Sequence, residues 1–317
     1  MSNVIEVKRL IKDYGSLHAV NGIDLEVHKG EVFAFLGPNG AGKTTTVEIL
    51  EGIRPRTSGS VDVLGIDPWH DGLKLIHKIG VIPQGFNFFE KITPAEAIRF
   101  YAGLFRKNTN VDELLKKVQL EDKAKDVFDS LSGGQKQKMG LALSMVNDPE
   151  ILFLDEPTSG LDPQARRAIW DVIRSLKAEG KTVFLTTHYL EEAQILADRV
   201  AIIDLGKIIV TGTPSEIIQE HGHREVLRIE APPAMAEYLR SHLDLQVDVR
   251  DSTVEVEIRV KEDVLRVLNV AETSGIPWEG VTTHMETLED VFIRMVGKMD
   301  EGTVAGEGKK GGAPLGK

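Results

Sequence analysis

The feature that most constrains this chain is a glycine-rich turn between an apolar segment and a helical segment. Five apolar residues, Val32–Leu36, lead into Gly37–Thr44, and a helical run, Thr45–Leu50, follows. The turn fits the pattern G-x-x-x-x-G-K-[ST], whose glycines let backbone N–H groups surround phosphate oxygens. The start of the helix adds a partial positive charge. The sequence therefore predicts an α/β core with a phosphate site between a strand and the next helix.

The side chains of this turn indicate a nucleoside triphosphate and its metal ion. In a P-loop, the lysine contacts the β- and γ-phosphates, and the hydroxyl of the next residue binds Mg²⁺. Lys43 and Thr44 occupy these two positions. The predicted phosphate-binding residues are Gly37, Pro38, Asn39, Gly40, Ala41, Gly42, Lys43, Thr44 and Thr45.

A second apolar segment, Ile151–Leu154, ends in two adjacent carboxylates, Asp155 and Glu156. Ligands of open α/β sheets gather at the carboxyl ends of the strands, so we expect both acids to face the glycine-rich turn. A carboxylate there holds Mg²⁺ through water, which predicts Asp155 as a metal residue. Glu156 is predicted to polarise an attacking water. Without the turn, the pair would be an ordinary solvated strand end.

The rest of the first 222 residues predicts a parallel sheet with two additions. Continuous apolar runs indicate strands buried on both faces at Val32–Leu36, Ile151–Leu154, Thr182–Thr186 and Val200–Ile203. Amphipathic stretches such as Gln164–Lys177 and Leu190–Ala197 alternate with them, as in a sheet covered by helices. Ile5–Leu10 and Ile23–Val27 alternate apolar with polar residues, which favours half-exposed antiparallel strands. Residues from about 90 to 148 predict a helical subdomain.

The segment Leu131–Gln135, with the sequence LSGGQ, resembles the signature of the ATP-binding cassette (ABC) ATPases. Ser132 also precedes a helical run, so it is a candidate N-cap, and both roles are compatible. Other marks of the family occur in the family's order over residues 3 to 220. They are Tyr14 of the A-loop, Gln84 of the Q-loop, Ser159–Asp162 of the D-loop and the switch histidine His188.

The resemblance implies a mechanism in which two copies of the cassette bind two ATP molecules between them, head to tail. It implies that Glu156, His188 and Gln84 are catalytic and that Thr44, Gln84 and Asp155 bind Mg²⁺. It further implies nucleotide contacts from Tyr14, Ser132, Gly133, Gly134, Gln135 and Asp162, with the signature residues acting on ATP held by the other subunit.

After residue 222 the pattern changes to a small α+β domain over residues 223–299. The expected elements are Glu225–Glu230, Pro233–Leu243, Leu245–Val249, Val254–Val260, Val264–Ser274, Val281–His284 and a last helix Thr287–Val296, with a hairpin turn at 250–252. The order β-α-β-β-α-β predicts a ferredoxin-like unit. Residues 300–317 are predicted to form a disordered tail. Thr287–Phe292 and Thr186–Ala193 resemble motifs of the daunorubicin-type drug-resistance subfamily of type-two ABC exporters.

Composition and hydropathy limit the macromolecules, metals and membrane contacts that this chain can be expected to have. The net charge of −11 argues against a nucleic-acid partner, because such binding depends on Lys and Arg. The absence of cysteine excludes disulfides and Cys-ligated metals. No apolar stretch approaches the roughly 20 residues that cross a bilayer, so we expect a peripheral protein on the cytoplasmic face of the membrane. A separate permease is expected to contact the aromatic-rich region Phe86–Phe105, where Phe88 and Phe89 are candidates for the socket.

The helical spacing of Phe100, Tyr101 and Phe105 predicts that these side chains lie in the core of the helical subdomain, whereas Phe86, Phe88 and Phe89 are harder to bury locally.

The motifs and the subfamily resemblance together predict ATP hydrolysis that drives an exporter. An importer ATPase is the alternative. A non-transport ABC ATPase acting on ribosomes or DNA is less favoured, because the chain has one cassette and only about a hundred residues or fewer between its P-loop and its signature.

Overall fold

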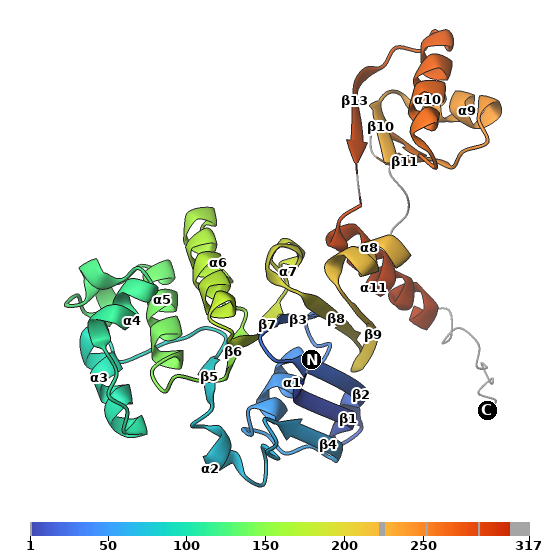
Figure 1. Ribbon diagram of the computed structural model, residues 1–317. Helices are drawn as coiled ribbons and strands as arrows, with labels where there is room; N and C mark the ends of the chain where they lie inside the picture. The colour runs from blue at the N-terminus through green and yellow to red at the C-terminus, as the bar shows by residue number, and fades with distance from the viewer. Residues whose placement is uncertain (1, 222–225, 251–252, 285, 305–317) are drawn as a thin grey trace, which may run out of the picture. The chain divides into compact units, whose positions relative to one another are not determined.

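The computed structural model describes residues 2–221, 226–250, 253–284 and 286–304, and the chain divides into two compact units (Figure 1). The first unit is Met1–Pro214 and the second is Ser215–Lys317. The division falls before the predicted boundary at residue 222, because helix α8 (Pro214–His221) is tied to the second unit. Arg294 donates a hydrogen bond to the carbonyl of His221. Among the described helices, none combines the length and the apolar character that a bilayer crossing requires.

The first unit is built on a six-stranded sheet in the order β5-β6-β7-β3-β8-β9. The strands are β5 (Ile79–Ile82), β6 (Ile151–Asp155), β7 (Thr182–Thr187), β3 (Val32–Leu36), β8 (Arg199–Asp204) and β9 (Lys207–Gly212). All pairings are parallel except that of β9 with β8. The four strands predicted from continuous apolar runs are confirmed to within one residue at each end. β5 and β9 were not predicted, since β5 has only four residues and β9 is half-exposed.

One face of this sheet packs against a three-stranded antiparallel sheet in the order β2-β1-β4, which confirms the predicted antiparallel addition (Figure 1). Its strands are β1 (Asn3–Tyr14), β2 (Leu17–His28) and β4 (Ser58–Val63). α1 (Lys43–Leu50) packs on the same side. Phe33, Phe35, Phe153 and Phe184 are fully buried there, and the Phe184 ring lies 5.6 to 5.8 Å from the other three. Alternate residues of the strands therefore define this part of the core.

The other face packs against α6 (Pro163–Ala178), α7 (Leu190–Leu196) and a helical segment in the predicted range. The helices of that segment are α3 (Pro94–Phe105), α4 (Val111–Lys117) and α5 (Gly133–Ser144), with short 3-10 turns at Glu121–Lys123 and Phe128–Ser130. Residues 90–148 contain no strand. A short helix, α2 (Gly72–Leu75), precedes β5.

The second unit contains a four-stranded antiparallel sheet in the order β11-β12-β10-β13. Its elements are β10 (Val226–Glu230), α9 (Pro233–His242), β11 (Val247–Arg250), β12 (Thr253–Glu257), α10 (Lys261–Thr273), β13 (Glu279–His284) and α11 (Leu288–Val304). The alternating residues Leu227, Ile229, Val254 and Val256 bury one face of the sheet. α11 continues to Val304, so the predicted disordered tail was wrong for residues 300–304, and residues 305–317 lie outside the described part of the chain.

Candidate functional site

The turn that joins β3 to α1 requires glycine at two positions. A Cβ on Gly37 would lie 2.3 Å from the carbonyl oxygen of Ile203, and a Cβ on Gly42 would lie 2.3 Å from that of Ala19. Gly42 also has a φ of 106°, in the left-handed region. Gly42 is the N-cap of α1 and supplies no side-chain acceptor to the first N–H groups of the helix. The N-terminus of α1 is therefore built to accept an anion.

Lys43 lies folded over this turn. It is 6% exposed, and its Nζ donates hydrogen bonds to the carbonyls of Gly37 at 2.7 Å and Pro38 at 3.1 Å. Burial lowers the pKa of Lys43, while the charges of Glu156 and Asp155 act in the opposite direction. The ammonium group is thus held on the turn, where the charges of the acidic pair act on it.

Asp155 ends β6 at the carboxyl edge of the sheet and is 7% exposed. The hydroxyl of Thr186 on β7 donates a short hydrogen bond to Asp155 Oδ1. Burial raises the pKa of Asp155; the bond from Thr186 and the charge of Lys43 oppose this shift, whereas Glu156 adds to it. The sequence analysis did not identify Thr186 as a residue of the site. The available signal was its position at the end of a buried strand, which places it at the same edge of the sheet as Asp155.

The three residues predicted to be catalytic meet at one carboxylate oxygen. Gln84 Nε2 donates to Glu156 Oε2 at 2.9 Å, and His188 Nδ1 lies 3.1 Å from the same oxygen. The Glu156 side chain is 8% exposed and that of His188 is 42% exposed. Glu156 has a φ of 48°, and its N–H donates to the carbonyl and the hydroxyl of Thr186. A non-glycine residue in this conformation is strained, and such strain concentrates at functional sites.

The LSGGQ segment lies beside α6. Ser132 is the N-cap of α5, and it forms a reciprocal capping box with Gln135, so the predicted helix start is confirmed. A Cβ on Gly134 would approach Ala165 of α6 to 2.7 Å, which requires a glycine at this point. In the described part of the chain, no hydrogen bond or ion pair joins residues 132–135 to residues 37–45.

Two further predicted nucleotide residues occupy the ends of secondary-structure elements. Asp162 is the N-cap of α6, and its Oδ1 accepts hydrogen bonds from the N–H groups of Gln164 and Ala165, each at 2.9 Å. Tyr14 ends β1 and is 40% exposed. The Lys12 ammonium lies 5.0 Å and the Arg54 guanidinium 5.5 Å from the centroid of its ring. The geometry thus gives Asp162 a capping role and places two cations beside the partly exposed ring of Tyr14.

Comparisons with known proteins identify the family. A model of the ABC transporter family matches residues 20–159. A daunorubicin resistance ATP-binding protein of Streptomyces coeruleorubidus is 35% identical over 298 residues, which cover 90% of this chain and 93% of that protein. The chain belongs to the ABC transporter family. It is an ATP-binding cassette subunit, an ATPase whose hydrolysis is coupled to transport.

Other relatives agree with this assignment. Nod factor export ATP-binding protein I of Ralstonia nicotianae is 35% identical over 305 residues, 93% of this chain and 94% of its own length. Among solved structures, a dimeric bacterial ABC transporter cassette has a TM-score of 0.59 at 28% identity and covers 66% of this chain and 98% of that chain. The cassette fold and the subfamily resemblance expected from the motifs are both confirmed.

A groove of about 410 Å³ lies between the helical segment of the cassette and the strand β5. Its lining is mainly apolar, from Ile53, Ile76, Ile79, Val81, Phe86, Phe88, Tyr101 and Phe105. The predicted division of the aromatics was wrong in three places. Phe86 is partly buried against Phe128 and over Gly140, and Phe88 is partly buried against Tyr101 and Phe128, whereas Phe100 is 50% exposed. The tertiary contact with Gly140 could not be inferred from helical spacing. Phe89 is 70% exposed.

One acidic residue, Glu51, also lines this groove. It is 9% exposed, and its burial, with the nearby charges of Asp155 and Glu48, raises its pKa to about 8. The sequence analysis did not identify Glu51, because its separation from Asp155 along the chain hides their proximity.

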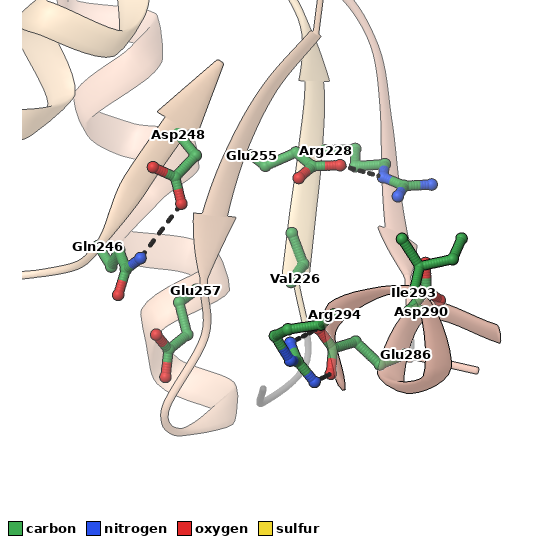
Figure 2. A pocket seen from close by; sticks show the side chains of 10 residues that line it. All are labelled: Val226, Arg228, Gln246, Asp248, Glu255, Glu257, Glu286, Asp290, Ile293 and Arg294. Carbon is green, nitrogen blue, oxygen red and sulfur yellow. Dashed lines mark hydrogen bonds and ion pairs between the residues drawn. The ribbon is translucent and has the colours of Figure 1, made fainter. Parts of the chain in front are cut away.

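The second unit contains a hollow of about 350 Å³ between the open face of its sheet and the start of α11, shown in Figure 2. Figure 2 also shows that its two arginines are paired. Arg228 binds Glu255 at 2.8 Å, and Arg294 binds Glu286 at 2.9 Å. Because both cations are matched by carboxylates of the hollow, this surface has the character of a solvated polar sheet face.

Proposed function

We propose that this chain is the ATP-hydrolysing subunit of an ABC exporter, acts at the cytoplasmic face of the membrane and drives a separately encoded permease. The observation that carries the proposal is the likeness, over 90% or more of the chain, to proteins named for daunorubicin resistance and Nod factor export. The transported substrate would then be recognised by the permease.

The P-loop residues Gly37–Thr45 would bind the phosphates of ATP, with the ammonium of Lys43 on the β- and γ-phosphates. The uncapped N-terminus of α1 and the buried position of Lys43 support this assignment. The exposed ring of Tyr14 would stack on the adenine, a contact worth about 1 kcal/mol.

The residues at the carboxyl edge of the sheet fit Mg²⁺. The proposed ligands are the Thr44 hydroxyl, the Gln84 amide oxygen and the Asp155 carboxylate, all oxygen donors, which Mg²⁺ prefers. The described residues contain no cluster of three or more His, Cys, Asp or Glu that would form an all-protein metal site. This fits an ion that takes its remaining ligands from phosphate and water. When bound, the ion supplies positive charge beside the phosphate oxygens.

Glu156 is proposed to polarise the attacking water, and His188 and Gln84 to orient it and the γ-phosphate. The convergence of Gln84 Nε2 and His188 Nδ1 on Glu156 Oε2 supports these roles. The carboxylate is thereby held in one orientation, and its other oxygen has no partner among the hydrogen bonds and ion pairs of the described residues. Positioning and charge stabilisation provide most of the catalysis in phosphoryl transfer.

Two copies of the chain are proposed to bind ATP between them, with Ser132, Gly133, Gly134, Gln135 and Asp162 of one copy near the nucleotide of the other. Dimeric structures of similar cassettes support this arrangement.

The apolar groove beside β5 is proposed to receive the permease. Its apolar lining and the exposed ring of Phe89, which follows the lining residue Phe88 in the chain, support this, because exposed aromatic side chains are typical of interfaces. Replacing Phe88 and Phe89 by Ser should weaken assembly with the permease, whereas Leu205→Ser, at another apolar surface position of the first unit, should not. Equal assembly of both variants would exclude these phenylalanines from the interface.

The second unit is proposed to be a ferredoxin-like domain with a dimerisation or regulatory role. The antiparallel strand order β11-β12-β10-β13, with helices after β10 and β12, supports the split β-α-β topology.

The central test is ATP turnover by the purified chain with Mg²⁺, together with size-exclusion chromatography of the Glu156→Gln protein. The wild type should hydrolyse ATP, and Glu156→Gln should bind ATP, lose turnover and elute as a dimer only when ATP is present. Wild-type turnover in Glu156→Gln would remove this residue from its role. Reconstitution with the permease encoded nearby, followed by transport assays in both directions, tests export.

A further inference from the structure

A buried carboxylate, Glu192, lies behind the two loops that carry Glu156 and His188. It belongs to α7, which begins two residues after His188, and its exposure is 0%. A carboxylate is rarely buried in this way unless hydrogen bonds or a counter-charge compensate for the lost water. Its partners therefore indicate what it does.

The partners of Glu192 come from the loop that follows Glu156 and from α6. Oε1 accepts a hydrogen bond from the hydroxyl of Thr158 at 3.0 Å and from the indole of Trp170 at 2.8 Å. Thr158 is fully buried and lies two residues after Glu156. Glu192 thereby holds the loop of Glu156 against helix α6.

The turn that carries His188 joins directly onto the helix of Glu192, whose N–H donates to the carbonyl of Tyr189 at 3.1 Å. Burial raises the pKa of Glu192, and the hydroxyls of Thr187 and Thr158 and the indole of Trp170 oppose that shift. The other carboxylate oxygen, Oε2, makes no geometrically sound hydrogen bond to a described residue. The N–H of Tyr189 donates to the Thr187 hydroxyl at 2.9 Å, which fixes the turn on both sides of His188.

A second set of contacts fixes the ring of His188. The Arg166 guanidinium of α6 lies 4.3 Å from the centroid of the Tyr189 ring, and that ring lies 4.1 Å from the imidazole of His188. The charge of Arg166 also lowers the pKa of Glu192. Glu192 and Arg166 therefore contact both loops, Glu192 through the hydroxyl of Thr158 and Arg166 through the ring of Tyr189.

We infer that Glu192 is a positioning residue for ATP hydrolysis: through Thr158 and the Thr187–Tyr189 turn, it sets the separation between the carboxylate of Glu156 and the imidazole of His188. This inference rests on the proposed roles of Glu156 and His188. The alternative is a purely structural role, in which Glu192 only accepts hydrogen bonds from buried donors in the core. Its loss would then lower stability and leave turnover unchanged.

The experiment compares steady-state ATP hydrolysis by the full chain carrying Glu192→Ala, Glu192→Gln or Glu31→Ala. Glu31 is the matched control, a glutamate that is 8% exposed, binds Arg199 and accepts from the N–H of His28 in the same unit. Glu192→Ala should lower kcat about tenfold or more with KM within about twofold, since small displacements of catalytic groups cost large factors in rate. Glu192→Gln keeps an oxygen acceptor for Thr158 and Trp170 and should restore kcat to within about threefold of the wild type.

Glu31→Ala should lower the melting temperature while leaving kcat unchanged. If Glu192→Ala behaves like Glu31→Ala, the positioning role is refuted. Should Glu192→Ala fail to fold, Thr158→Val, which removes one donor and keeps the side-chain shape, should lower kcat in the same way, and wild-type kcat in that variant would overturn the inference. Turnover that persists in Glu156→Gln would instead refute the proposed role of Glu156, which separates the two failures.

Discussion

Replacing Glu51 by Gln is expected to remove a pH dependence of stability that the wild type carries. The folded protein raises the pKa of Glu51 from 4.5 to about 8, chiefly by burial, with further contributions from Asp155 and Glu48. Between these pH values, the unfolded chain releases a proton that the folded protein keeps. The free energy of unfolding therefore falls as pH rises from about 4.5 to about 8. Above that range the loss of stability due to Glu51 is complete and no longer changes with pH.

The size of the effect follows from the same pKa values. One pH unit corresponds to about 1.4 kcal/mol, so the interval from 4.5 to about 8 sets an upper limit of about 5 kcal/mol. Glu51 lines the groove and is not sealed from water, so a loss of about 2 to 4 kcal/mol is expected in practice. Gln has nearly the same shape and no charge, so Glu51→Gln should lack this loss.

Urea denaturation between pH 5 and pH 8.5 measures the effect. In a Trp278→Phe background, the remaining tryptophans, Trp69 and Trp170, both report on the unit Met1–Pro214. The variant and the wild type should differ by about 1 kcal/mol at pH 5 and by about 2 to 4 kcal/mol at pH 8. Glu150→Gln, an exposed acid paired with Lys78, is the control and should leave the pH dependence unchanged. Parallel curves for Glu51→Gln and wild type would refute the reasoning.

Three further substitutions test the site and the core. Lys43→Ala should abolish ATP binding in equilibrium dialysis while circular dichroism stays native, because within the described residues the Lys43 side chain bonds to carbonyls of its own turn; retained affinity would contradict its role. Phe184→Ala should lower the free energy of unfolding by about 3 to 5 kcal/mol, since the ring is fully buried among three others, and a loss below about 1 kcal/mol would contradict the packing argument. Asp162→Ala should cost about 1 kcal/mol by loss of the α6 N-cap. Asp162→Asn keeps the cap, so a fall in kcat without a fall in stability would reveal a separate contact with nucleotide.

Much of the fold could be predicted where neighbouring residues in the chain decide the structure. The apolar run Val32–Leu36 matches β3 at both ends, because a strand buried on both faces needs apolar residues throughout. The glycines of the P-loop could be assigned for the same reason, since the turn itself demands them. By contrast, β5 has only four residues, and Phe86 is partly buried by packing over the distant Gly140, so neither has a local signal.

The catalytic residues divide in a similar way. Resemblance identified Gln84 and His188, and Glu156 was also identified by its place after an apolar strand. Only the structure brings Gln84 and His188 to one oxygen of Glu156. Gln84 and Glu156 are 72 positions apart in the chain. Sequence periodicity does not predict the distances in space from Gln84 and His188 to Glu156, because these distances depend on how β5, β6 and β7 align within the sheet.

The sequence by itself determined the chemistry of the phosphate turn, the alternation of strands and helices and the family. Each of these depends on residues that are adjacent or evenly spaced in the chain. The tertiary structure alone decided the strained backbone of Glu156, the raised pKa of Glu51 and the burial of Glu192 between two loops. These properties arise from desolvation and contacts among residues remote in the chain, and they exist only once the sheet and its helices have packed.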